Sequence, residues 1–138
     1  MIKVWFDGSC MPNPGGVIGY GAIIKRHEEI IYEISKRANI SPEKSTNNVA
    51  EYCACIASMK YLIHHNLQAN EVYMFGDSQL VIKQMRQEWQ IGDGKYAEYA
   101  DMAQQLLPKF SNITFEWIPR EKNTGADLLA RRGSGFFR

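Results

Sequence analysis

Near its start the chain carries Ile2-Lys3-Val4-Trp5-Phe6-Asp7, an apolar, β-prone run that ends on an acid. The next residues are Gly8-Ser9-Cys10-Met11-Pro12-Asn13-Pro14-Gly15-Gly16, which are rich in turn formers and predict a loop. Two further β-prone runs, 21–25 and 30–34, are separated by His27-Glu28-Glu29. The first part of the chain therefore predicts three strands in an antiparallel meander.

The apolar pattern changes after residue 46. Residues 47–65 contain no Gly or Pro, and their apolar side chains recur at helical spacing. Further on, the pattern predicts a strand at 71–75, helices at 78–87 and 95–107, a strand at 113–118 and a last helix at 123–132. We expect an α/β fold with helices flanking a five-stranded mixed sheet, in which strands one to three are antiparallel and strands four and five run parallel to strand one.

Composition places the chain among ordinary globular domains. Its 138 residues suit one domain, and 45% hydrophobic with 22% charged residues excludes a disordered or fibrous protein. No apolar run approaches the roughly 18 residues of a membrane span. The start does not resemble a secretory signal, and an odd count of three cysteines favours reduced thiols, so we expect a cytoplasmic protein. The net charge of +1 gives no indication of a nucleic-acid partner.

Four acids stand out by their positions. Asp7 ends the first predicted strand and Asp77 follows the strand at 71–75, while Glu51 and Asp127 lie in the helices 47–65 and 123–132. Acids at strand ends suit a site at the edge of a sheet, and carboxylates are the ligands of hard cations such as Mg²⁺. Any one of them alone equally suits a turn or a helix cap.

The motifs around these acids resemble those of the type 1 ribonuclease H family. The first is Asp7-Gly8-Ser9-Cys10, followed by Asn13-Pro14-Gly15 and Gly19-Tyr20-Gly21-Ala22. The others are Thr46-Asn47-Asn48-Val49-Ala50-Glu51-Tyr52, Asp77-Ser78-Gln79 and Asn123-x-x-Ala126-Asp127-x-Leu129-Ala130. A single Asp-Gly-Ser would be a weak signal, but four motifs in order across nearly the whole chain are specific.

The resemblance implies a metal-dependent endonuclease. Asp7, Glu51, Asp77 and Asp127 would be its catalytic carboxylates and would bind two Mg²⁺ ions, with Mn²⁺ as the alternative. The implied reaction cleaves the RNA strand of an RNA/DNA hybrid and leaves a 3′-hydroxyl and a 5′-phosphate. One ion would activate water and the other would stabilise the leaving 3′-oxygen.

The resemblance also implies substrate contacts. Asn47, Asn48 and Gln79 match positions that read the minor groove of the hybrid, where amides suit 2′-hydroxyls and base edges. Asn13 and Thr46 match positions associated with phosphates of the DNA strand. Glu51 is the acid suited to accept a hydrogen bond from a ribose 2′-hydroxyl, which would distinguish RNA from DNA.

The chain departs from the family pattern in three ways. The link 88–95 is too short to hold the basic helix and loop that many bacterial members carry. None of the three histidines lies in the loop 118–123 just ahead of the last acid, so Arg120 is the candidate to act near the leaving phosphate in place of a loop histidine, although it equally suits a solvated loop. No hybrid-binding domain precedes the domain, which we place at residues 1–132 with a tail at 133–138.

Weaker signals have simpler explanations. Cys53-x-Cys55 with His64-His65 lacks the spacing of a zinc site, so we expect buried cysteines. Trp117 and the set Tyr96, Tyr99 and Met102 are expected in the core, whereas Trp89 is a candidate contact to the DNA strand. We expect a monomer whose Phe136-Phe137 docks on its own domain or on a partner.

Two other classes of function remain to be compared with the endonuclease. A binding module without activity has no reason to keep four mutually repelling carboxylates. An exonuclease or integrase on the same fold is the second, and the exonuclease would carry an acid two residues after Asp7, where this chain has Ser9. Cleavage of double-stranded RNA stays open as an additional activity.

Overall fold

A single mixed sheet organises the protein, whose computed structural model describes residues 1–135. Its strand order is β3-β2-β1-β4-β5. The strands are β1 (Ile2–Met11), β2 (Val17–Arg26), β3 (Glu29–Ala38), β4 (Glu71–Gly76) and β5 (Asn112–Trp117). The first three are antiparallel neighbours, whereas β4 pairs with β1, and β5 with β4, in parallel. This is the predicted sheet.

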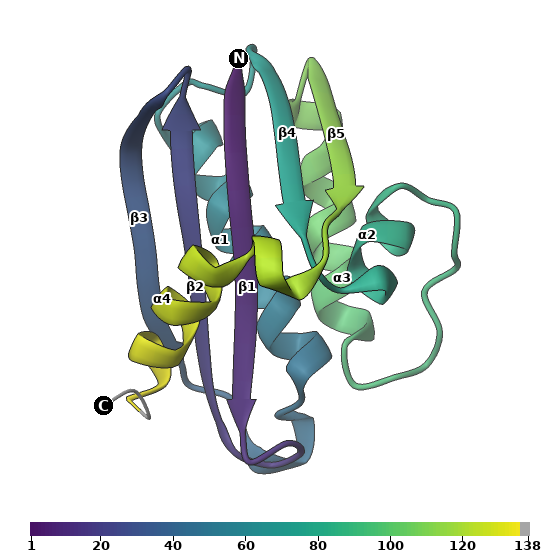
Figure 1. Ribbon diagram of the computed structural model, residues 1–138. Helices are drawn as coiled ribbons and strands as arrows, with labels where there is room; N and C mark the ends of the chain where they lie inside the picture. Colours follow the sequence, from purple (N-terminus) through teal and green to yellow (C-terminus); the bar gives the residue numbers. More distant parts are fainter. Residues whose placement is uncertain (136–138) are drawn as a thin grey trace.

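Helices cover the two faces of the sheet unequally (Figure 1). One face carries α1 (Asn47–His64), with α2 (Gln79–Met85) and α3 (Ala97–Leu106) beside it, and the other carries α4 (Thr124–Ser134) alone. Short 3₁₀ turns occupy Pro42–Lys44, Leu107–Lys109 and Arg120–Lys122. All four predicted helices are confirmed, with ends that differ by a few residues; α4 continues through Gly133 to Ser134.

The strand β1 extends further than predicted. Residues 8–11 were expected to begin a loop, but the pairing with β2 is continuous from Ile2 opposite Arg26 to Met11 opposite Val17. The turn-forming composition of this segment is overridden by a ten-residue ladder of hydrogen bonds to β2. The predicted loop is therefore confined to residues 12–16.

The core lies between the sheet and α1. Alternate residues of β1, namely Ile2, Val4 and Phe6, are fully buried against apolar side chains of α1 such as Met59 and Leu62. Burial of this size supplies about 1.5–3 kcal/mol for each large side chain. This packing fixes α1 along β1.

Two glycines allow the helices to approach the sheet closely. A Cβ at Gly8 would overlap the main chain of Ala50 and Glu51 in α1, and one at Gly21 would overlap α4 at Leu129 and Ala130. With no side chain at these positions, α1 approaches β1 directly and α4 approaches β2 directly. The two helices that carry Glu51 and Asp127 are thereby held against the sheet from opposite faces.

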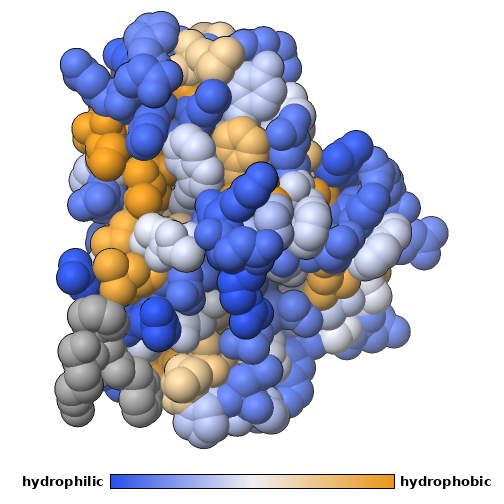
Figure 2. All heavy atoms as spheres, in the orientation of Figure 1, coloured by the Kyte–Doolittle hydropathy of each residue, from blue (hydrophilic) through white to orange (hydrophobic). Residues whose placement is uncertain are grey.

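The face under α4 is only partly covered, and two predicted core residues are exposed. Figure 2 shows pale and orange side chains between hydrophilic ones over the upper part of this face. Trp117 is 44% exposed, because it stands at the end of the edge strand β5, where its indole N–H donates to the carbonyl of Asp77 at 3.1 Å. Met102 is exposed on the outer side of α3, so only Tyr96 and Tyr99 of the predicted set pack against the core.

Replacing Gly8 tests the close approach of α1. Gly8→Ala would place a methyl group inside the backbone of α1, so we expect a loss of about 3 kcal/mol in the free energy of unfolding, measured by urea denaturation. The matched control is Gly92→Ala, whose Cβ would meet only the Tyr96 hydroxyl at 3.4 Å and should change stability by less than about 0.5 kcal/mol. Equal stabilities of the two variants would contradict this account.

Candidate metal and nucleic-acid site

Two of the predicted acids meet because β1 and β4 part. Their parallel pairing ends with Trp5 opposite Phe75, after which β4 stops at Gly76. Asp7 and Asp77 each stand two residues beyond this last pair, one on each chain segment. The strand end therefore opens an edge of β1 and places both carboxylates beside it.

The start of α1 is clamped to the end of β1 by three polar side chains. The hydroxyl oxygen of Thr46 accepts from the Val49 N–H at 3.2 Å and caps the helix. Asn13 accepts from the Asn47 N–H, and Asn47 in turn accepts from the Cys10 N–H, both at 3.1 Å. The first turn of α1 is thus fixed beside β1, and Glu51 follows it.

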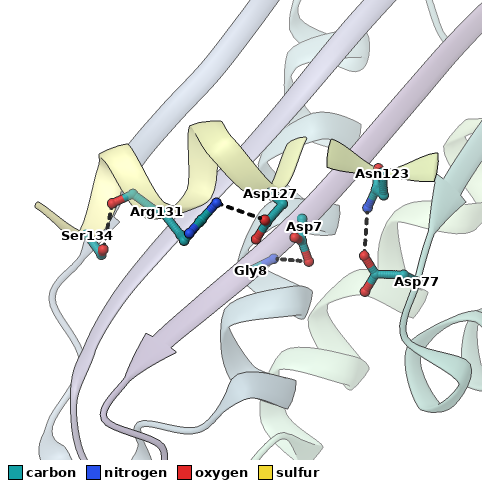
Figure 3. Close-up of polar contacts among 7 residues, drawn as sticks. All are labelled: Asp7, Gly8, Asp77, Asn123, Asp127, Arg131 and Ser134. Carbon is teal, nitrogen blue, oxygen red and sulfur yellow. Dashed lines mark hydrogen bonds and ion pairs between the residues drawn. The ribbon is translucent and has the colours of Figure 1, made fainter. Parts of the chain in front are cut away.

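Asp7, Glu51 and Asp77 form a carboxylate cluster, in which Asp7 and Glu51 are buried and Asp77 is half-buried. Each offers an oxygen, and these oxygens lie within 4.8 Å of one another. Asp7 is 5% exposed and Glu51 6% exposed, so little water screens their charges. The Gly8 N–H donates to Oδ1 of Asp7 at 3.0 Å (Figure 3).

Burial shifts the protonation of this cluster. It raises the pKa of Asp7 from 3.8 to about 7; a hydrogen bond with Glu51 opposes the rise, and the charges of Asp77 and Asp127 add to it. The pKa of Glu51 is raised well above its usual range, first by burial and then by the charge of Asp7. Without a counter-ion, the cluster therefore holds protons near neutral pH.

The cluster fits a divalent cation. Oε2 of Glu51 is buried and has no hydrogen-bond partner, and the ligand atoms are all carboxylate oxygens, which hard cations prefer. Within residues 1–135 this is the only group of at least three His, Cys, Asp or Glu side chains close enough to share a metal. Cys53 and Cys55 were expected to be buried; Cys55 is buried and Cys53 half-buried.

Asp127 stands at the side of the cluster. It points from α4 toward Asp7 (Figure 3), and its Oδ2 pairs with a guanidinium nitrogen of Arg131 at 3.4 Å. It is not one of the three residues whose oxygens lie within 4.8 Å of one another, but it lines the same cleft and raises the pKa of Asp7. Arg131 was missed from the sequence, although its position four residues after Asp127 on a helix was the available signal.

The cleft around the cluster measures about 580 Å³ and contains most of the predicted substrate-binding residues. Asn13, Asn47, Asn48 and Arg120 line it together with the four acids. Thr46 and Gln79 are not among its lining residues: Thr46 caps α1, and Gln79 is exposed at the start of α2. Trp89 is 48% exposed in the link after α2 and lines a different pocket.

Asn123 is a site residue whose role the sequence did not indicate. It is 1% exposed, and its Nδ2 donates both to the carbonyl of Phe6 at 2.9 Å and to Oδ2 of Asp77 at 3.1 Å (Figure 3). One amide thus ties β1, the end of β4 and the start of α4 together. It orients Asp77 without adding charge.

Comparison with known proteins places the chain in a family. The family described as Reverse transcriptase-like matches residues 5–133. A protein named Ribonuclease H from Edwardsiella ictaluri is 30% identical over 148 aligned positions, which cover 97% of this chain and 90% of that protein. The chain belongs to the ribonuclease H family.

Solved structures of this family share the fold. The N-terminal RNase H domain of Rv2228c from Mycobacterium tuberculosis has a TM-score of 0.84 at 34% identity, over 96% of this chain and 98% of that one. LC11-RNase H1 in complex with an RNA/DNA hybrid has a TM-score of 0.79 at 31% identity, over 98% and 97%. These are hydrolase domains of the size found here.

The domain also occurs inside longer proteins. The bifunctional protein Rv2228c is 38% identical over 126 residues, and these cover 90% of this chain. This chain spans about a third of that protein's length, since the match covers 33% of it. Within residues 1–135, no helix is both long and apolar enough to cross a bilayer.

The raised pKa of Asp7 predicts how stability depends on pH in the metal-free ribonuclease H domain. The folded state holds a proton that the unfolded chain releases near pH 3.8, so the free energy of unfolding should fall as pH rises from about 4 to about 7. The upper limit of this fall is on the order of 4 kcal/mol. It is measured by urea denaturation in EDTA across this pH range.

The control for this pH dependence is Asp7→Asn. This variant lacks the titrating carboxyl group and should show a flatter profile and greater stability than the unmodified protein at pH 8. Adding Mg²⁺ at pH 8 should stabilise the unmodified protein more than the variant. Identical pH profiles for the two proteins would refute the assignment.

Asn123→Asp tests the amide bridge. The change removes both donors and places a second carboxylate beside Asp77, so we expect a loss of about 2–3 kcal/mol in the free energy of unfolding in EDTA. Asn39→Asp, an exposed position before the first 3₁₀ turn, is the matched control and should be near neutral. An Asn123→Asp protein as stable as this control would show that the bridge contributes little.

Proposed function

We propose that this domain is an endonuclease that hydrolyses the RNA strand of RNA/DNA hybrids. The observation that carries the proposal is the carboxylate cluster of Asp7, Glu51 and Asp77, which opens into a cleft also lined by Asp127 and by asparagine amides. Support comes from the relatives named Ribonuclease H and from the hybrid bound to LC11-RNase H1. The cluster has no structural purpose that offsets its mutual repulsion.

The four acids would hold two divalent cations, which we propose to be Mg²⁺ with Mn²⁺ as the alternative. Bound cations would supply positive charge at the reacting phosphate and make water a stronger nucleophile. Asp7 and Glu51, whose pKa values are raised, would release their proton when a cation binds. The Asn123 amide keeps Asp77 in place. Asp127 would become a ligand by leaving its weak, partly exposed ion pair with Arg131.

The remaining groups of the cleft would position the substrate. We infer that Asn47, Asn48 and Gln79 contact the minor groove, and that Asn13 and Thr46 lie near phosphates of the DNA strand. Glu51 would accept a hydrogen bond from the ribose 2′-hydroxyl, so that a DNA strand lacks the contact. Amides donate and accept equally well, which suits binding without sequence preference.

The reaction follows from this arrangement. Water would add its oxygen to phosphorus and release one proton to the solvent, the bond to the 3′-oxygen would break, and the leaving oxygen would take up one proton from the solvent, which yields a 3′-hydroxyl and a 5′-phosphate. We infer that the guanidinium of Arg120, at the rim of the cleft, stabilises the negative charge that develops there. Arg120 would thereby take the role that a loop histidine has in other members of the family.

A cleavage assay with labelled substrates tests the function. With Mg²⁺ or Mn²⁺ present, we expect internal cuts in the RNA strand of a hybrid and none in a DNA duplex. Asp7→Asn and Glu51→Gln should each lower the rate at least about a thousandfold, because the cations lose a ligand. Asp101→Asn, exposed on α3, is the control that should cleave normally.

Two outcomes of this assay decide between alternatives. Absence of cleavage with either metal would refute the endonuclease and leave a binding module. Cuts that start only at strand ends would indicate an exonuclease instead. A double-stranded RNA arm shows whether the cleft also accepts that duplex.

Arg120→Ala tests the proposed role at the leaving phosphate. If the guanidinium stabilises the transition state, kcat should fall about tenfold to a hundredfold while KM changes little. Arg120→Lys keeps the charge but not the planar geometry, and should recover only part of the rate. Unchanged turnover in Arg120→Ala would remove the role.

A further inference from the structure

A second pocket lies on the α1 face of the sheet. It measures about 440 Å³, lies between β3 and the last turns of α1, and shares no residue with the acidic cleft. Its α1 residues begin six positions after Glu51, at Ala57, and end at the helix terminus. At 1.5 Å per residue, Lys60 stands roughly 14 Å along the helix from Glu51. In Figure 1, α1 runs behind the sheet from one end to the other, so the two sites lie toward its opposite ends.

One wall of the pocket is a stack of three rings. Tyr61 lies between Tyr32, at a centroid distance of 4.2 Å and 7° between planes, and His65, at 4.1 Å and 26°. We call Tyr32, Tyr61 and His65 the ring stack. Both outer rings are exposed, Tyr32 by 38%. His64 lies obliquely against His65 at a centroid distance of 5.1 Å, so the outer face of Tyr32 is the one that can accept another flat ring.

The charged side chains of the pocket are all basic, and they stand among apolar and aromatic neighbours such as Ile34 and Tyr20. Lys36 of β3 and Lys60 of α1 line it from opposite sides, and His64 lies beside them. No carboxylate is among its lining residues, and no ion pair of the described chain involves Lys36 or Lys60. In a chain with 16 basic and 15 acidic residues, a concave site with basic residues alone is a local excess of positive charge.

We propose that this pocket binds a nucleotide unit. Its base would extend the ring stack, and its phosphate would lie between the ammonium groups of Lys36 and Lys60. A flat ring and an anionic group within one small ligand match the aromatic and the basic side chains of the pocket, because nucleic-acid bases stack on exposed aromatic rings. The unit can be a free mononucleotide or one residue of a single strand, and the proposal does not depend on hybrid cleavage.

Binding is measured on the full chain carrying Asp7→Asn, in EDTA, so that the acidic cleft cannot hold phosphate through a metal. Titrations followed by amide NMR use AMP, adenosine, ribose 5-phosphate and a short oligo-dA strand. We expect AMP to bind with a Kd of about 0.1–1 mM and to shift resonances of residues 32–36 and 57–65. Adenosine and ribose 5-phosphate should each bind at least about tenfold more weakly, because each lacks one half of the ligand.

Variants separate this site from general charge attraction. Lys60→Glu, Lys36→Glu and Tyr32→Ala should each weaken AMP binding about tenfold, whereas Lys109→Glu, outside the pocket, should not. If oligo-dA binds much more tightly than AMP, the ligand is a single strand. If the two bind with equal affinity, the ligand is a free nucleotide. The proposal is overturned if AMP shifts no pocket resonance at about 10 mM, if ribose 5-phosphate equals AMP, or if Lys60→Glu and Lys109→Glu behave alike.

Discussion

The contact of α1 with β1 at Gly8 is the constraint on which the rest of the structure depends. Because no side chain separates the two backbones, the first turn of α1 reaches the end of β1 and brings Glu51 against Asp7. The parting of β1 and β4 adds Asp77, and the approach of α4 at Gly21 brings Asp127 to the rim. Four acids that are far apart in the chain are thus gathered by backbone packing.

This gathering has an electrostatic cost that the protein meets with neutral groups. The Gly8 N–H donates to Asp7 and the Asn123 amide donates to Asp77, and neither donor carries a charge. Among residues 1–135, Asp127 is the only one of the four acids that pairs with a cationic side chain, and it does so at the exposed side of the site. A fixed positive side chain inside the cluster would compete with a divalent ion. Neutral N–H donors instead orient the carboxylates and leave their negative charge available to a cation.

The sequence predicts the order of the elements and the positions of the acids, because apolar periodicity and the acid at each strand end are local signals. It does not predict that residues 8–11 are strand, since their turn-forming composition yields to pairing with β2. The exposure of Trp117 depends on β5 being the sheet edge, which local pattern does not reveal. Asn123 is the clearest case, because its partner Phe6 lies 117 residues away.

The link between α2 and α3, residues 86–96, projects away from the sheet on the side of α2 (Figure 1). It contributes no residue to the acidic cleft or to the pocket beside β3. Its exposed part can therefore vary in length without moving the carboxylates, as long as Ile91 and Tyr96 keep their packing against the core. This makes the domain a minimal scaffold for protein engineering. Insertions in this link could change the affinity for a long substrate without changing the residues of the cleft.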